Sequence, residues 1–405
     1  MSIIEQSAVW NCAAFCILAL ALTGAAQAAE SRDDVVVVKN PSSLKADRLP
    51  AKRIPVGRPG DYKPCIAQLP TGKLILVMFE PRHLEGGEYQ EDIIIYRSTD
   101  GGRTWGAREV PPILGREPYF SMTRNGTLFL TVHLLQQDRR NKDGYIHSYL
   151  HRSTDGGHTW QTVRIGTEDV PGAADKAWII TSRNVLELSD ATLIVGVSAP
   201  NGHDYLWRSK DGGLTWDRSL ACTWEGVSGD QVWWPFWAEM VLWETPAHNL
   251  LAIARVDPRI FPAIPGTTLP EYTNDEIERM VVFRSTDGGR TWKNRVDFGD
   301  YGEMYSAIQR LRDGRLLLTF TVRSLHPPLG VQAVFGRATA DGFEFDFEHD
   351  RVVLDAKTPA DKPSGGGFGP TVQLVDGTLV TAYSYRDAND QTHVEVVRWS
   401  IPTAR

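Results

Sequence analysis

The chain has 405 residues, a formal net charge of −7 at pH 7, 42% hydrophobic residues, 23% charged residues and 36 glycines. This composition is typical of a globular, turn-rich protein and excludes a disordered or collagen-like chain. No run of Lys or Arg exceeds two residues. We therefore expect no nucleic-acid partner, because such binding needs a dense cationic surface to neutralise phosphates.

The N-terminal region has the features of an export signal. An apolar stretch from Ala13 to Ala26 leads into Ala26-Gln27-Ala28, which has the small-x-small form of a signal-peptidase site. The stretch is shorter than the roughly 20 apolar residues that span a bilayer. We expect a signal peptide over residues 1–28, no membrane span and a secreted or periplasmic protein. Because the segment before the stretch carries Glu5 and no Lys or Arg, an uncleaved anchor is the alternative.

Cleavage after Ala28 would leave Cys65 and Cys222 as the cysteines of the mature chain. Two cysteines in so long a chain do not form a disulfide framework, so we expect two unpaired core thiols, with a single bridge as the alternative. No His, Cys or carboxylate spacing predicts a zinc site. We expect neither a metal nor a cofactor, and the sequence does not indicate an oligomeric state.

Four segments share the pattern R-S-x-D-G-G-x-T-W, which we call the Asp box. They are Arg97–Trp105, Arg152–Trp160, Arg208–Trp216 and Arg284–Trp292, and a degraded copy stands at Ala340-Asp341-Gly342. Asp followed by two glycines suits a tight hairpin turn, because glycine adopts positive φ and the carboxylate accepts turn amide hydrogens. The four copies predict a repeat fold in which these Asp residues are structural.

A second repeat lies between the boxes, where hairpins link pairs of alternating β-branched runs. Their equivalent turn positions are Gly72, Gly126, Ala191, His248, Gly314 and Gly377. Each hairpin is followed by an Asp box or its remnant, which predicts an all-β, six-bladed β-propeller over residues 29–405. We expect the spare strand Val35–Lys39 to close the ring beside His393–Trp399.

The boxes, the hairpin count and the motif order resemble those of the sialidase (neuraminidase) superfamily, and the resemblance covers essentially the whole mature chain. It implies a six-bladed propeller and an exported exo-glycoside hydrolase acting on an anionic terminal sugar, with sialic acid as the default. Function still has to be argued from the site, because one fold hosts many functions.

Residues at two fixed offsets from the turns predict the site. Because a hairpin folds one strand back beside the other, the start of each inner strand and the end of the next lie at the same rim. Nine residues before the turns stand Lys63, Glu117, Ser182, Glu239, Tyr305 and Phe368, and seven to nine residues after them stand His133, Arg255, Arg323 and Arg386. We expect a cationic pocket with embedded carboxylates formed by Lys63, Glu117, His133, Glu239, Arg255, Tyr305 and Arg323.

The family resemblance is closest at Glu239 and Arg255, because in sialidases the glutamate that activates the nucleophile precedes a carboxylate-binding arginine by the same sixteen residues. Arg323 falls near another arginine of the family's carboxylate clamp. The first clamp arginine lies in an Arg-Ile-Pro tripeptide in the family; here Lys63 holds that place, while a literal Arg53-Ile54-Pro55 occurs ten residues earlier. Lysine keeps the charge but loses the bidentate grip on a carboxylate.

The chain departs from the family at the nucleophile. Phe368 stands where sialidases have a catalytic tyrosine, and Tyr305 occupies the matching place one blade earlier. The family's acid/base aspartate follows the first hairpin, where the local residues are Glu85, Glu88 and Asp92.

Three functions stay open at this point. The first is a hydrolase with Tyr305 as nucleophile, Glu239 as its base and the cations as carboxylate ligands. The second is a lyase on uronate polysaccharides with Tyr305 or His133 as base. The third is a non-catalytic carbohydrate-binding propeller. The aromatic segment Trp233–Trp237 fits either a sugar-stacking platform or packing between blades.

Overall fold

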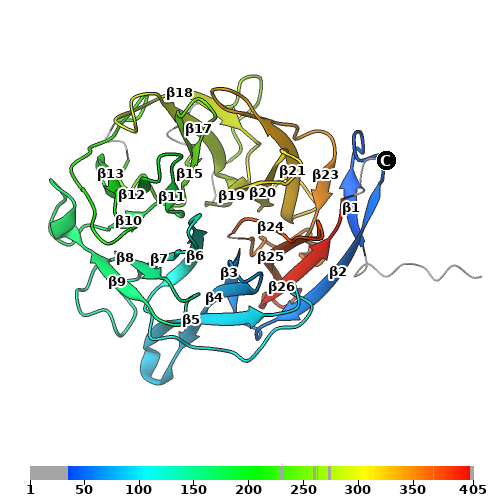
Figure 1. The fold of residues 1–405 in the computed structure, drawn as a ribbon, viewed down its shortest axis with the longest axis horizontal. Helices are drawn as coiled ribbons and strands as arrows, with labels where there is room; N and C mark the ends of the chain where they lie inside the picture. Colours follow the sequence, from blue (N-terminus) through cyan, green and yellow to red (C-terminus); the bar gives the residue numbers. More distant parts are fainter. Residues whose placement is uncertain are drawn as a thin grey trace, which may run out of the picture.

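The computed structural model describes residues 35–228, 232–258, 261, 263–271, 275–367 and 369–401. Their strands form a six-bladed β-propeller, with sheets arranged in a ring around a central axis (Figure 1). The predicted signal peptide, residues 1–28, lies outside the described residues. In the part that is described, no helix has the length and apolar character needed to cross a membrane.

The first three blades follow one another along the chain. Blade 1 holds β3 (Tyr62–Gln68), β4 (Leu74–His83) and β5 (Tyr89–Ser98); blade 2 holds β6 (Arg116–Met122), β7 (Leu128–Leu134), β8 (His147–Ser153) and β9 (Gln161–Ile165); and blade 3 holds β10 (Ile180–Thr181), β11 (Leu186–Glu187), β12 (Leu193–Ala199) and β13 (His203–Ser209). Short 3₁₀ turns are η2 (Glu85–Gly87), η3 (Thr167–Asp169) and η5 (Asp275–Ile277).

Of the other three blades, blade 4 is a separate sheet, whereas blades 5 and 6 belong to one 10-stranded sheet. Blade 4 holds β15 (Val241–Glu244), β16 (Leu250–Val256), β17 (Arg279–Ser285) and β18 (Thr291–Phe298), with β14 (Thr223–Trp224) parallel to β18; blade 5 holds β19 (Glu303–Arg310), β20 (Leu316–Val322), β21 (Gly330–Ala338), β22 (Phe343–Phe345) and β23 (Arg351–Val353); and blade 6 holds β24 (Val372–Gln373), β25 (Leu379–Arg386), β26 (Thr392–Trp399) and β2 (Arg48–Val56).

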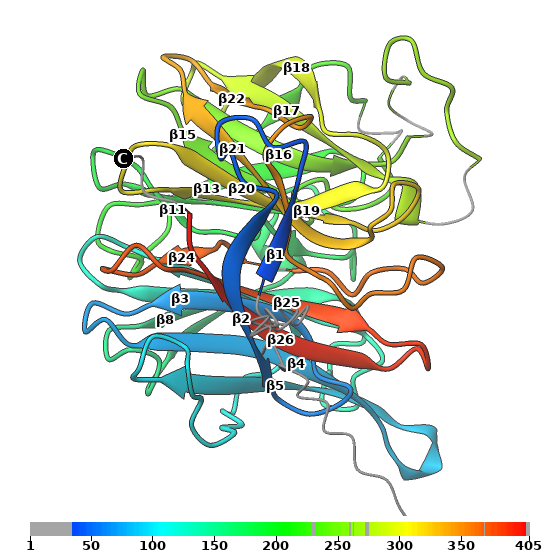
Figure 2. The same ribbon diagram turned by 90° about the vertical axis from the view of Figure 1, so that its right-hand side faces the viewer.

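The N-terminal strands close the ring in a way that differs from the prediction. The neighbour of β26 is β2, whereas β1 (Val35–Lys39) pairs with β2 on one side and with β23 of blade 5 on the other. The prediction for Val35–Lys39 was therefore wrong in its partner, because β2 supplies the strand that β26 needs. β2 therefore covers the outer edge of β26, and β1 bridges blades 5 and 6; both strands lie on the side of the propeller that faces the viewer in Figure 2.

The predicted turn equivalence is confirmed by the backbone. All six turn positions have φ between 62° and 89°, including the non-glycine residues Ala191 and His248. Each of these residues also donates its amide hydrogen to the carbonyl three residues earlier, at 2.8–3.0 Å. The six hairpins thus share one turn geometry although their sequences differ.

The Asp boxes are turns, as predicted. In the box of blade 4, Asp287 Oδ1 accepts hydrogen bonds from the amides of Arg290 and Thr291 at 3.1 and 3.0 Å, and its Oδ2 accepts one from the Thr291 hydroxyl at 2.6 Å. These donors hold the pKa of Asp287 down at about 2, against the opposing effect of partial burial. The carboxylate therefore serves the turn and is remote from the channel.

The arginine that opens each box links neighbouring blades. Arg97 donates to the carbonyls of Gly156 and Gly157 in the next box, at 2.7 and 2.9 Å, and Arg152 donates to Gly212 at 2.7 Å. Arg208 donates to Gly288, and Arg398, the equivalent residue of blade 6, returns to Gly101 at 2.9 Å. At the equivalent register position, blade 5 has Phe335, and the next blade has no Asp box to receive an arginine. The arginines form a belt around the outside of the propeller that is interrupted between blades 5 and 6.

Apolar strand residues fill the spaces between blades. The largest fully buried side chains include Trp207, Trp237, Trp292 and Trp399. Cys65 and Cys222 are both buried and free, which confirms the expectation of two unpaired core thiols.

Candidate active site

Four predicted site residues share an unusual backbone conformation. Lys63, Glu117, Glu239 and Tyr305 have φ of 48°, 51°, 61° and 61°, although none is glycine. In β3, β6 and β19 the pairing register shifts at this residue, which marks a β-bulge. Bulges re-aim side chains and are frequent beside functional sites. This repeated left-handed conformation directs one long side chain from each of four blades toward the channel.

The phenol ring of Tyr305 is the meeting point of the site. Its centroid lies 5.1 Å from Lys63 Nζ, 5.0 Å from the Cζ atom of Arg183 and 5.6 Å from the Cζ atoms of both Arg255 and Arg323. Arg323 also donates a hydrogen bond to the Tyr305 hydroxyl. These cations come from blades 1, 3, 4 and 5, and contacts at such distances are attractive when they are shielded from water.

Tyr305 is also held from the side of blade 6. Gly366 has φ +77°, and a Cβ atom added there would lie 2.8 Å from the Thr321 hydroxyl oxygen and 3.3 Å from the Tyr305 ring. Only glycine combines this backbone conformation with so close an approach. The glycine-rich segment of blade 6 therefore packs against one side of the Tyr305 ring. With 3% exposure, Tyr305 is almost fully enclosed.

Glu117 is paired with Lys63 across the first two blades. Lys63 Nζ donates to Glu117 Oε1 at 2.5 Å, and Arg116 Nη2 lies 3.5 Å from the same oxygen. Burial tends to raise the pKa of Glu117, but Lys63, Arg116 and His133 bring the pKa well below its usual value. Burial lowers the pKa of His133 to about 4 despite the nearby charge of Glu117. At neutral pH the site thus contains an ionised glutamate beside a neutral histidine.

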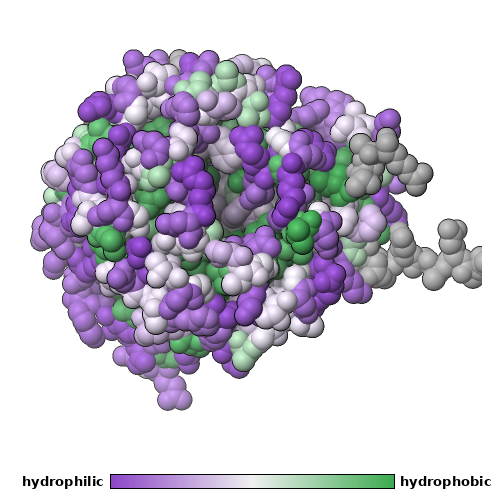
Figure 3. Space-filling model, viewed as in Figure 1, coloured by the Kyte–Doolittle hydropathy of each residue, from purple (hydrophilic) through white to green (hydrophobic). Residues whose placement is uncertain are grey.

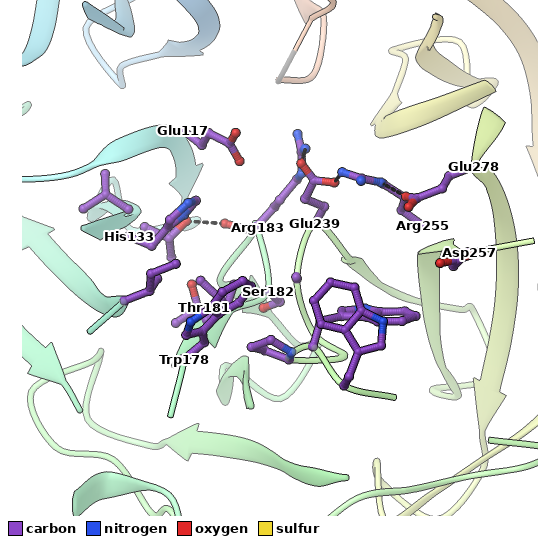
Figure 4. A pocket seen from close by; sticks show the side chains of 18 residues that line it. Glu117, His133, Trp178, Thr181, Ser182, Arg183, Glu239, Arg255, Asp257 and Glu278 are labelled. Carbon is purple, nitrogen blue, oxygen red and sulfur yellow. Dashed lines mark hydrogen bonds and ion pairs between the residues drawn. The ribbon is translucent and has the colours of Figure 1, made fainter. Parts of the chain in front are cut away.

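Glu239 is held between two arginines. Arg255 donates to Glu239 Oε2, and Arg183 Nη2 lies 3.3 Å from Oε1. Arg255 in turn donates through Nε to Glu278. Figure 4 shows Arg183, Glu239, Arg255 and Glu278 in one continuous row. Burial opposes ionisation of Glu239, but Arg255 and Arg183 outweigh it and lower the pKa of this carboxyl.

The tyrosine is protonated at neutral pH. Burial raises the pKa of Tyr305, Glu239 raises it further, and the charges of Lys63, Arg255 and Arg323 only partly offset the increase. A phenol in this state needs a base to remove its proton as it reacts. Glu239 is the carboxylate whose charge acts on it most strongly.

A cavity of about 340 Å³ opens beside this cluster. The face of the propeller in Figure 3 is hollowed at its centre, where hydrophilic residues border the opening. The charged wall of the cavity contains Glu117, His133, Arg183, Glu239, Arg255, Asp257 and Glu278. The rest of the lining includes Trp178, Trp233, Trp234, Pro235, Ile146 and Ile180. The volume falls within the range of roughly 300–1,000 Å³ that is usual for ligand pockets.

The structure brings together all seven predicted pocket residues, but in two layers. Glu117, His133, Glu239 and Arg255 line the cavity, whereas Lys63, Tyr305 and Arg323 form a second layer. Lys63 contacts Glu117, the Tyr305 ring packs against Arg255, and Arg323 contacts Tyr305. Arg386, at the end of β25, is not among the lining residues. The nucleophile candidate thus lies beneath the cationic cluster rather than on the cavity surface.

Several other predicted residues lie elsewhere. Arg53 of the Arg-Ile-Pro tripeptide is buried on β2, where it donates to the hydroxyl of Tyr383 at 2.7 Å, and Tyr383 donates to Glu395 at 2.5 Å. The literal motif is therefore a structural contact of blade 6. Asp92 is paired with Arg82 and Arg140 at 2.9 Å each.

None of Glu85, Glu88 and Asp92, the acid/base candidates from the first hairpin, lines the cavity. Phe368 lies outside the described residues. Ser182 does line the cavity, but it is fully buried and its hydroxyl accepts a hydrogen bond from the Gly196 amide at 3.0 Å.

Sequence reasoning missed Arg183, Arg116 and Glu278. In blade 3 the inner strand is interrupted between β10 and β11, and the residue that enters the site is Arg183, one position later than in the other blades. Arg116 and Glu278 each neighbour a predicted position or pair with one. A search for charged residues within one position of each offset would have found the two arginines. Glu278 stands on the approach to β17 and has no such signal.

Among the residues with described structure, no group of three or more His, Cys, Asp or Glu side chains could hold a metal ion. The arrangement instead combines cations, paired carboxylates and a buried phenol. Chemically, it can bind an anion, stabilise a developing phenolate and transfer protons through carboxylates.

Comparison with solved structures gives the same architecture. A protein of unknown function from Dyadobacter fermentans is 20% identical, with 92% of this chain and 99% of that chain covered and a TM-score of 0.63. The intramolecular trans-sialidase of Ruminococcus gnavus is 14% identical over 84% of this chain and 94% of that chain, with a TM-score of 0.57. The Trypanosoma rangeli sialidase is 14% identical over 91% of this chain and 58% of that chain, with a TM-score of 0.54.

Among curated proteins, xyloglucanase Xgh74A of Acetivibrio thermocellus is 26% identical over 280 residues. The match covers 55% of this chain but only 31% of the xyloglucanase. The model of the BNR repeat-like domain matches residues 57–318, which include blades 1 to 4, the first strand of blade 5 and the start of its second strand. The chain belongs to the BNR repeat-like domain family.

Proposed function

We propose that the protein is an exported exo-glycoside hydrolase that removes an anionic terminal sugar, with sialic acid as the default substrate. The observation that carries the proposal is the gathering of Lys63, Arg183, Arg255 and Arg323 around the ring of Tyr305, beside Glu239. Four cations drawn from four blades are costly to bury together. A site that binds an anion and stabilises a phenolate explains their arrangement.

In the proposed first step, Lys63, Arg255 and Arg323 bind the carboxylate of the sugar. The Tyr305 oxygen forms a bond to the anomeric carbon while the glycosidic C–O bond breaks, and the phenolic proton passes to Glu239. The departing oxygen takes up a proton from a second carboxyl group. In the second step, the oxygen of water bonds to the anomeric carbon and its proton passes to that second carboxylate, while the tyrosyl–sugar bond breaks and Glu239 returns its proton to the phenolate oxygen. Because Tyr305 is only 3% exposed, the cationic side chains must part to admit the substrate.

Glu117 is the carboxyl that we assign to protonation of the departing oxygen. Its pKa is now held low mainly by Lys63 and Arg116, against the effect of burial. An incoming carboxylate brings negative charge close to Glu117. It also competes with Glu117 for the ammonium group of Lys63. Both effects raise the pKa of Glu117 toward the range of a proton donor.

The solved structures support this substrate class. The Ruminococcus gnavus trans-sialidase was determined with oseltamivir carboxylate and the Trypanosoma rangeli sialidase with sialic acid. Both ligands carry a carboxylate, and both proteins share the fold of this chain.

A panel of fluorogenic anionic glycosides, including sialic acid and uronic acids, tests the proposal. We expect hydrolysis of at least one member, and a loss of at least tenfold in kcat/KM in Arg323→Gln. A matched control is Arg337→Gln, because the Arg337 side chain is 75% exposed on the surface of blade 5. Hydrolysis that is equally weak in both variants, or absent from the wild type, would count against the proposal.

A uronate lyase is the second candidate, because His133 lines the cavity and is neutral at neutral pH. A neutral imidazole can abstract a proton next to a carboxylate whose charge the arginines neutralise. The same panel distinguishes the two reactions, since a lyase forms an unsaturated product that absorbs in the ultraviolet. Binding of anionic sugars without any reaction would instead support a carbohydrate-binding propeller.

Export and domain extent are part of the proposal. The apolar stretch that ends at Ala26-Gln27-Ala28 supports cleavage after Ala28 and a mature single domain over residues 29–405. N-terminal sequencing of the protein recovered outside the cytoplasm should begin at Ala29. A mature protein that retains residues 1–28 would favour the uncleaved anchor.

A further inference from the structure

We infer that the apolar side of the cavity is a second sugar subsite, in which Trp178 and Trp233 hold an uncharged pyranose ring next to the anionic terminal sugar. This inference rests on the proposed function and deepens it, because it specifies the part of the substrate beyond the cleaved bond. The substrate would then be an anionic sugar linked to an uncharged one.

The first observation is exposure. Trp178 is 39% exposed and Trp233 is 59% exposed, and they are the exposed tryptophans among the described residues. Large aromatic side chains usually bury most of their surface in a folded protein. The fold itself does not use these two rings, although it buries Trp237 of the same segment completely.

The second observation is position. The two exposed rings lie against each other, with centroids 6.3 Å apart and ring planes at 66°, and Trp233 contacts Trp234 at 5.6 Å. All three line the same cavity as Glu117 and Glu239. Figure 4 shows Glu239 and Arg255 along one side of this pocket and Trp178 on the other. The cavity is therefore divided into a charged wall and an aromatic wall.

The chain supplies the aromatic wall from two segments that each lead into a site residue. Trp178 comes shortly before Arg183, and Trp233 shortly before Glu239. A ligand that bridges the two walls would thus contact, in each segment, both a tryptophan and a charged residue. The segment Trp233–Trp237 serves both roles considered from the sequence, because Phe236 and Trp237 are core residues while Trp233 faces the cavity.

The chemistry of the aromatic wall suits a pyranose ring. One face of a pyranose presents C–H groups, which are weakly positive and pack on the electron-rich face of an indole. The sugar's hydroxyl groups at the ring edge stay available to water or to polar lining residues such as Thr181 and Asp257. A volume of about 340 Å³ is at the lower end of the usual range for ligand pockets, which suits a disaccharide better than a long glycan.

Isothermal titration calorimetry with lactose, cellobiose and maltose tests the subsite directly, using the full mature chain. We expect saturable binding of at least one of these uncharged disaccharides, and binding about tenfold weaker in Trp233→Ala and in Trp178→Ala. Trp233→Tyr should restore most of the affinity, because it returns an aromatic face. Leu214→Ala is the matched control, since Leu214 is 57% exposed in an Asp box away from the cavity. Thermal unfolding of each variant checks that it is folded.

The failure of this inference is separable from failure of the proposed function. If no disaccharide binds, or if both alanine variants bind like the wild type, the subsite is wrong even when the glycoside panel shows hydrolysis. If the disaccharide binds through the tryptophans but no anionic glycoside reacts, the subsite stands and the hydrolase proposal falls. Kinetics add a second measurement when a substrate is known: Trp233→Ala should lower kcat/KM for a disaccharide substrate about tenfold. It should leave kcat/KM for the corresponding glycosyl fluoride unchanged, because fluoride makes no contact with the subsite.

Discussion

The ammonium nitrogen of Lys63 lies 5.1 Å from the ring centroid of Tyr305, although the two residues begin the inner strands of blades 1 and 5. Both sit at a β-bulge with positive φ, so the same backbone irregularity aims both at the channel. A cation placed against a phenol favours its ionised form as a proton leaves. The repeat geometry thus assembles the centre of the candidate site from residues far apart in the sequence.

Gly366→Ala should disturb this centre. The new Cβ atom would approach Thr321 and the Tyr305 ring, so we expect loss of activity on the identified substrate in addition to about 1–2 kcal/mol of left-handed strain. Gly314→Ala is the control, because Gly314 has φ +89° and open space around it. Kinetics and urea unfolding of both variants measure the difference. Equal activity in the two variants would show that Gly366 does not position Tyr305.

Asp287→Ala should lower the free energy of unfolding by about 1–3 kcal/mol without weakening ligand binding. The reason is that its carboxylate accepts hydrogen bonds from Arg290, Thr291 and Ser285 within the turn and contacts nothing in the channel. Urea denaturation and ligand titration check the two parts. A fully stable variant that has lost ligand affinity would overturn the structural assignment of the box.

Arg97→Ala tests the belt of arginines. We expect the free energy of unfolding to fall by about 1–2 kcal/mol, because the carbonyls of Gly156 and Gly157 lose a charged donor. Arg103→Ala is the matched control, since Arg103 is exposed in the same box and its side chain donates only locally, to the Asp100 carbonyl. Urea denaturation of both variants measures the effect, and equal stability of the two would refute a role of the belt in joining blades.

The sequence predicted the architecture well because the repeat is carried by local turn chemistry. Residues nine positions before each turn were found by counting, and the count succeeded at Lys63, Glu117, Glu239 and Tyr305 because each of these residues has the same left-handed backbone conformation. The count missed Arg183, because the inner strand of blade 3 is interrupted.

Long-range packing decided what the sequence could not show. Whether the charged side chains face solvent or one another depends on how six sheets close into a ring, and the sequence does not encode those distances locally. Two features therefore could not be predicted from the sequence: the burial of Tyr305 beneath its cations, and the burial of Arg53 against Tyr383. The closing strand was misassigned because Arg48–Val56 was not predicted to be a strand, and this segment, β2, is the one that pairs with β26.

His151 should make stability depend on pH. Burial is the cause that lowers its pKa from 6.5 to about 4, so between these values the unfolded chain binds a proton that the folded protein does not. Stability therefore falls as the pH drops from 6.5 to about 4, by about 1.4 kcal/mol per pH unit at most. His151→Phe removes this contribution, so its free energy of unfolding should decline less than that of the wild type over the same window. Parallel stability profiles for the two proteins would contradict the prediction.

The catalytic assignment of Tyr305 and Glu239 is tested most directly by kcat and ligand affinity of the wild type, Tyr305→Phe and Glu239→Gln on the substrate that the glycoside panel identifies. A phenol with a raised pKa cannot attack without its hydroxyl and a neighbouring base. We predict that Tyr305→Phe abolishes turnover, that Glu239→Gln lowers kcat by about 100-fold or more, and that Tyr305→Phe still binds the anionic sugar. Near-normal kcat in Tyr305→Phe would contradict the mechanism.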